Sequence, residues 1–127
     1  MDLFEKPACR MPEALWCSFV PKTGQPDAWR LNKLGEWIAP NEVIHDGNRH
    51  LHAVWQGARW QSNGETLAID SLATALVAPG QPSLLNFTNE QPDLSRGVHF
   101  NLFNNLWGTI FPMWYEDDGK FRFVLRV

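Results

Sequence analysis

The chain of 127 residues has few cysteines, no long apolar run and no excess of positive charge. Cys9 and Cys17 are too few for a disulfide scaffold and lack the spacing of a four-ligand zinc site, which favours a reducing compartment. No stretch of about 18 apolar residues is present, so we expect no membrane-spanning segment. The first residues also lack the charged-then-apolar pattern of an export signal. The sequence therefore predicts a cytoplasmic protein.

The charge balance argues against a nucleic-acid partner. Eleven basic and fourteen acidic side chains give a formal net charge of −3, whereas a nucleic-acid-binding domain normally shows a basic face. The apolar content of 44% and the charged content of 20% are ordinary for a globular protein. The length corresponds to one domain.

Aromatic residues are abundant, and prolines and glycines are spread along the chain. There are 7 Trp, 8 Phe and 1 Tyr, with nine prolines and nine glycines between short apolar runs. This pattern is typical of many short strands joined by turns. We expect hairpins at His45–Asn48 and Asn63–Gly64, a turn at Asp117–Gly119, and a strand over 107–114. The C-terminal stretch alternates, which predicts four inward side chains: Phe121, Phe123, Leu125 and Val127.

The fold class that follows is all-β. About eight or nine short strands at this spacing predict an antiparallel β-sandwich of two packed sheets in a single domain. We place this domain at 11–127, after an N-terminal tail at 1–10.

Three of the four histidines lie in the segment I-H-D-G-N-R-H-L-H. His50 and His52 are two positions apart, so on a strand they share a face. With His45 or Asp46 as a further ligand they could hold a transition metal. The alternative is a polar sheet face on which the imidazoles bind their neighbours. The spacing is short and weakly specific, and we predict no metal or other cofactor.

A second group of polar and aromatic side chains lies between Val98 and Trp114. His99 and Asn101 share one face of an alternating segment, and further amides and indoles follow. Amides bind hydroxyls, and a Trp ring offers a platform for the C–H face of a sugar. Alternatively, the asparagines build turns and the tryptophans belong to the core. The candidate ligand-binding residues are His99, Asn101, Asn104, Asn105, Trp107 and Trp114.

No complete catalytic set can be assigned from the residues themselves. The acidic run 116–118 is better explained as a solvated turn than as the separated carboxylate pair of a glycosidase. The serines lack a G-x-S-x-G context, and no phosphate-binding glycine loop is present.

Three segments resemble a known family: M-P-E-A-L-W-C-S-F, G-N-R-H-L-H-A-V and H-F-N-L-F-N-N-L-W-G-T-I-F-P-M-W-Y-E-D-D-G-K-F-R-F. From about Arg10 onward the chain resembles the C-terminal region of microbial proteins related to the α-mannosidase class of glycoside hydrolases. Ile110 departs from this pattern, in which an asparagine is usual. The resemblance implies a β-sandwich of the galactose-mutarotase-like, or supersandwich, type. In that class the zinc ligands and the nucleophile lie in a catalytic barrel, which this chain does not contain, so no catalytic residue is carried over.

Three functions remain open from the sequence. The first is a non-catalytic accessory module that contacts carbohydrate or a protein partner, either a second copy or a catalytic domain, through its Asn/Trp-rich segment. The second is a small sugar-active epimerase or lyase that uses His99, or His50 and His52, as acid and base. The third is a purely structural oligomerising fragment.

Overall fold

The computed structural model describes residues 1–106 and 116–127. It confirms the predicted all-β class: antiparallel sheets pack together in one domain. The described helical segments are the single 3₁₀ turns η1 (Pro26–Ala28) and η2 (Leu94–Arg96). Within the described residues, no helix has the length and apolar character needed to cross a membrane.

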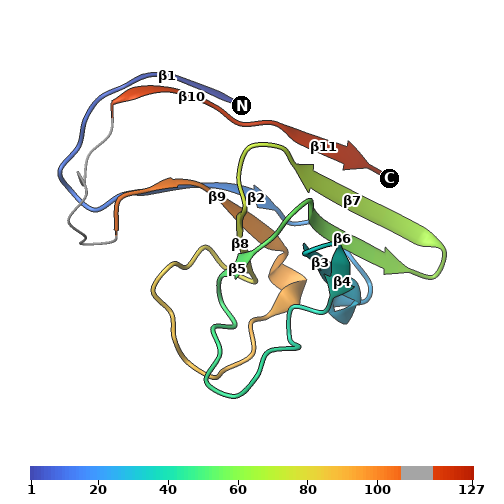
Figure 1. Ribbon diagram of the computed structural model, residues 1–127. Helices are drawn as coiled ribbons and strands as arrows, with labels where there is room; N and C mark the ends of the chain where they lie inside the picture. The colour runs from blue at the N-terminus through green and yellow to red at the C-terminus, as the bar shows by residue number, and fades with distance from the viewer. Residues whose placement is uncertain (107–115) are drawn as a thin grey trace.

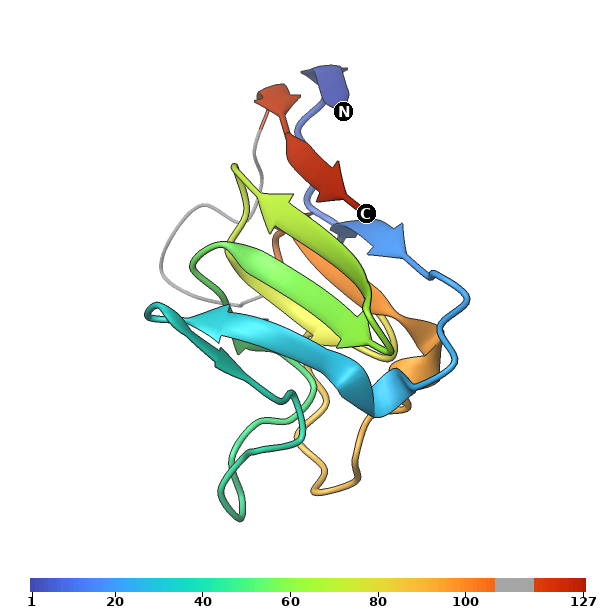
Figure 2. The same ribbon diagram turned by 90° about the vertical axis from the view of Figure 1, so that its right-hand side faces the viewer.

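One layer is a five-stranded antiparallel sheet in the order β11-β7-β6-β3-β4. Figure 2 shows it in front of the other layer. The hairpin predicted at Asn63–Gly64 is confirmed as the β6–β7 turn, since both residues have positive φ angles, 53° and 83°. Its strands are β3 (Trp29–Lys33), β4 (Glu36–Ile38), β6 (Gly57–Ser62), β7 (Glu65–Ser71) and β11 (Phe123–Arg126).

The other layer is a four-stranded antiparallel sheet in the order β2-β9-β8-β5. It contains β2 (Ala14–Phe19), β5 (His52–Ala53), β8 (Leu76–Pro79) and β9 (Val98–Asn104). A separate two-stranded ribbon pairs β1 (Asp2–Lys6) with β10 (Asp117–Lys120) and lies at the edge of the molecule (Figure 1).

The core lies between the two sheets and follows from the alternation of the strands. Phe19, Phe100 and Phe123 pack edge to face there, with ring centroids 5.2–5.9 Å apart, the geometry that aromatic quadrupoles favour. Phe100 is fully buried. The other buried core residues are Trp29, Leu31, Val54, Ala58, Trp60, Ile69, Val77, Leu94 and Val98.

The structure differs from several local predictions. The segment predicted as a tail contains β1, and Asp117–Gly119, predicted as a turn, belongs to its partner β10. The hairpin predicted at His45–Asn48 is a turn inside an irregular segment. Leu125 on the edge strand β11 and Val127 directly after this strand, both predicted to face inward, are exposed. Local patterns miss these features because they depend on distant pairing or on how far the facing sheet extends. The strand predicted for 107–114 lies outside the described residues.

Gly97 is expected to tolerate no side chain. Its φ of 84° and ψ of −155° lie in a region that is essentially restricted to glycine, and an added Cβ would overlap the carbonyl oxygen of Phe19. Gly97→Ala should therefore lower the free energy of unfolding by about 1–3 kcal/mol, measured by urea denaturation. Gly24→Ala is the control, because a Cβ there meets nothing within 4 Å. Equal stability of the two variants would contradict this account.

Candidate functional site

The outer face of the five-stranded sheet carries polar side chains. Trp29 and Leu31 point into the core, so alternation places Arg30 on the opposite face of β3. The register sets Arg30 directly opposite Arg59 on β6. Gln61 follows on the same face of β6, since Trp60 between them is buried in the core.

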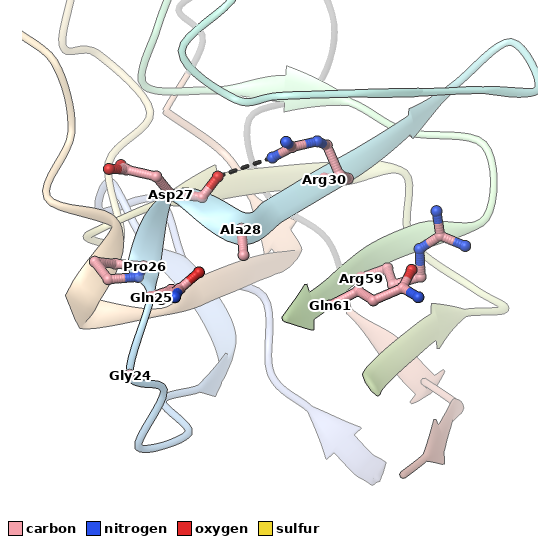
Figure 3. A pocket seen from close by; sticks show the side chains of 8 residues that line it. All are labelled: Gly24, Gln25, Pro26, Asp27, Ala28, Arg30, Arg59 and Gln61. Carbon is pink, nitrogen blue, oxygen red and sulfur yellow. Dashed lines mark hydrogen bonds between the residues drawn. The ribbon is translucent and has the colours of Figure 1, made fainter. Parts of the chain in front are cut away.

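These side chains line an open hollow of about 690 Å³, which we call the arginine hollow (Figure 3). The loop that contains η1 forms one wall, and β3 and β6 form the other. Its lining residues are Gly24, Gln25, Pro26, Asp27, Ala28, Arg30, Arg59 and Gln61.

Hydrogen bonds hold the loop wall of the hollow in place. The indole Nε1 of Trp60 donates to the Gln25 carbonyl oxygen at 2.7 Å. The hydroxyl of Ser62 donates to Gln25 Oε1 at 2.7 Å. Because Trp60 and Ser62 are themselves buried, the loop is fixed to the end of β6 and the hollow has a defined shape.

The two arginines of the hollow point in different directions. Arg30 Nη1 donates to the carbonyl oxygens of Asp27 at 2.8 Å and Trp29 at 2.7 Å. Figure 3 shows Arg30 reaching toward Asp27 while the Arg59 guanidinium points away from it. Separation of this kind reduces the repulsion between like charges on directly opposite strand positions.

The Arg59 guanidinium lies over the indole ring of Trp37 on β4, 4.4 Å from the ring centroid. This cation–π contact limits the movement of the guanidinium. Among the described residues, Arg59 Nε is buried and has no hydrogen-bond partner. Arg59 is therefore held beside Trp37, and no carboxylate of the described residues neutralises its charge.

A second hollow of about 300 Å³ borders Arg59 on its other side, between Trp37 and Arg126. There Arg126 Nη2 pairs with Asp70 Oδ2 at 2.6 Å. Among the described residues, neither Arg30 nor Arg59 forms such an ion pair with a carboxylate. The excess positive charge on this face is thus concentrated at Arg30 and Arg59.

The asparagines predicted to bind a ligand are engaged inside the protein. Asn105 donates to the carbonyl oxygens of Cys9 and Met11 at 3.2 and 3.0 Å, and its Oδ1 accepts from Glu13 N at 2.6 Å. Asn101 donates to backbone oxygens and accepts from Asn104 Nδ2 at 2.7 Å. These amides fasten the N-terminal segment and β2 to β9. Their contact with sugar stays a prediction.

The remaining predicted ligand-binding residues add little support for a sugar site in this segment. His99 is buried with its Nδ1 2.7 Å from Ser18 Oγ, and burial lowers the pKa of His99. Trp107 and Trp114 lie outside the described residues.

The three histidines considered for a metal have separate partners. His45 is exposed beside Asp46, and His50 Nε2 lies 3.2 Å from Thr88 Oγ1. His52 accepts a hydrogen bond from Lys33 Nζ at 2.9 Å and donates through Nε2 to the Arg49 carbonyl at 3.0 Å. In the part of the chain that the structure describes, no three His, Cys, Asp or Glu side chains are grouped to hold a metal ion.

Burial and, to a smaller extent, the nearby charge of Lys33 lower the pKa of His52 to about 4. Burial also lowers the pKa of Lys33. His52 is therefore neutral at pH 7 and acts as an internal hydrogen-bonding group, with one ring nitrogen accepting and the other donating.

The residues of the arginine hollow were not among the predicted site residues. The available signal was the alternation in W-R-L-N and A-R-W-Q, which places each arginine on the polar face of its strand. What the sequence does not show is the register that sets Arg30 opposite Arg59.

Comparisons of the chain with protein-family models, with curated proteins and with solved structures found no match. The likeness to the α-mannosidase class therefore stays a prediction from the residues alone, and the function has to be argued from the geometry of the hollow.

Proposed function

We propose that the protein is a non-catalytic β-sandwich module that binds carbohydrate in the arginine hollow. The observation that carries the proposal is an open, preformed hollow whose walls present amide and guanidinium groups. Sugar hydroxyls need both donors and acceptors: the Gln61 amide supplies both, and Arg59 and the Gln25 amide nitrogen, whose Oε1 already accepts from Ser62, add donors. The volume of about 690 Å³ lies within the usual range of small-molecule sites.

The composition of the hollow favours binding over hydrolysis. A glycosidase of the common type uses two carboxylates about 5–10 Å apart. Among the described residues that line the hollow, Asp27 is the single acid. The proposal therefore keeps the predicted accessory role but assigns the contact to the face of the five-stranded sheet.

Titration with a panel of neutral and acidic oligosaccharides is expected to shift the backbone amide NMR signals of residues 24–30 and 58–62. The shifts should saturate at millimolar sugar, because each bound ring contacts groups that line the hollow. Gln61→Ala should weaken binding, since it removes one hydroxyl-binding amide. Gln56→Ala is the matched control, because Gln56 is exposed and lies outside the hollow.

Two outcomes would contradict the proposal. One is the absence of any saturable shift with every sugar in the panel. The other is a set of shifts confined to residues 98–105, which would show that sugar binds at the Asn-rich segment predicted from the sequence and not in the arginine hollow.

A further inference from the structure

We infer that the saccharide bound in the arginine hollow is anionic, carrying a carboxylate or sulfate group that the Arg59 guanidinium holds. This inference rests on the proposed carbohydrate function and specifies its ligand class. It follows from the charge of the sheet face, the orientation of Arg59 and the shape of the hollow.

The first observation is a like-charged pair at directly opposite positions. Arg30 and Arg59 face each other across β3 and β6, and like charges in this arrangement are destabilising. The pair stands in a chain of net charge −3, yet neither member forms an ion pair among the described residues. The two guanidiniums point apart, which reduces the repulsion, and an anion bound in the hollow would neutralise the positive charge that remains.

The second observation is the fixed geometry of Arg59. Its Cζ lies 4.4 Å from the centroid of the Trp37 ring, so less side-chain freedom is lost when a ligand binds. The N–H edge of a guanidinium matches the two oxygens of a carboxylate or sulfate in a bidentate pair. Because Arg59 Nε is itself buried, the terminal Nη groups are the donors that we assign to this pair.

The third observation is the mixture of groups around the arginines. Gln25 and Gln61 line the same hollow and suit hydroxyls, which a simple inorganic anion lacks. The next cation along the face, Arg126, is already paired with Asp70 at 2.6 Å. Arg30 is already bonded to backbone carbonyl oxygens, which leaves Arg59 as the main anion-binding group. A single such group beside hydroxyl-binding amides fits a sugar with one acidic group better than a polyphosphate chain, whose binding is strengthened by many cations.

The experiment is a calorimetric titration of the intact chain with a trigalacturonate, a sulfated disaccharide, a neutral trigalactose and inorganic sulfate. At least one of the two acidic saccharides should bind about tenfold or more tightly than the neutral one, and added salt should weaken that binding. Whichever acidic sugar binds identifies the source of the charge. Arg59→Gln should reduce its affinity about tenfold or more, a larger loss than the same variant causes for any neutral sugar.

Two variants make the result specific. Arg59→Lys keeps the charge but removes the planar fork, so it should recover only part of the lost affinity. Arg122→Gln removes an exposed arginine outside the hollow and should bind like the parent chain. If Arg59→Gln fails to fold, Arg59→Lys and the comparison of sugars on the parent chain still test the inference.

The failures of the two proposals are distinguishable. Equal binding of neutral and acidic sugars in the hollow would overturn the anionic inference and leave the carbohydrate function standing. Sulfate alone binding as tightly as the acidic sugars would also overturn it, because the hydroxyl contacts would then contribute nothing. If no saccharide binds in the hollow, both proposals fall.

Discussion

Phe100→Ala is expected to lower the free energy of unfolding by about 3–5 kcal/mol, as measured by urea denaturation followed by Trp fluorescence. Phe100 is fully buried in the centre of the sandwich. Its ring contacts Phe19 on β2 at 5.9 Å and Phe123 on β11 at 5.2 Å. Truncation removes apolar burial and leaves a cavity between sheets that can relax only in part.

The matched control for this prediction is Phe87→Ala. Phe87 is 67% exposed, so its truncation should change stability by less than about 0.5 kcal/mol. Phe100→Leu retains most of the apolar volume and should give an intermediate loss, which keeps the test measurable if the alanine variant is largely unfolded. Equal effects at Phe87 and Phe100 would show that the aromatic cluster is not the centre of the core.

Lowering the pH from about 6.5 to 4 is expected to cost about 3 kcal/mol of folding free energy through His52. Its pKa is about 4 in the folded protein, because burial and the charge of Lys33 disfavour the protonated ring, and about 6.5 when unfolded. Between these values the unfolded chain binds a proton that the folded chain does not. The contribution of His52 to the folding free energy is therefore fully present above pH 6.5 and is lost as the pH falls from 6.5 to 4. His99, whose pKa burial also lowers, acts in the same direction.

Urea unfolding at pH 7, 5.5 and 4 checks this prediction. His52→Asn removes the titrating ring, so its stability should fall less steeply with acid than that of the parent chain, although it starts lower at pH 7. The exposed His45→Asn serves as control and should keep the parent slope. Parallel pH profiles for His52→Asn and the parent chain would contradict the account of the buried ring.

The sheet architecture could be predicted because most strands carry their own pattern. The alternation of β2 and β9 and the Asn63–Gly64 turn are local signals, and local signals determine strand existence and tight turns. The β1–β10 ribbon could not be predicted, since it joins segments such as Glu5 and Asp118 that are 113 positions apart. The exposure of Leu125 depends on how far the opposite sheet extends over β11, which the alternation of β11 does not reveal.

The candidate site was harder to predict for the same reason. Asn101 and Asn105 have the chemistry of sugar-binding residues, but the fold uses their amides to hold the N-terminal segment. Residue type alone does not separate a ligand contact from an internal tether. Arg30 and Arg59 become a site through cross-strand register and through the loop held by Trp60, both of which are tertiary features.

The strand pairing also sets an order in which a nascent chain can fold on the ribosome. β1 pairs with β10 and β2 pairs with β9 (Figure 1), so β1 and β2 wait for partner strands that are made much later. β6 and β7 form a hairpin and β3 pairs with β6, so these three strands can assemble soon after they emerge. Until β9 has been made, the apolar residues of β2 stay uncovered. Slow translation between β2 and β9 would therefore lengthen the interval in which aggregation or chaperone binding competes with folding.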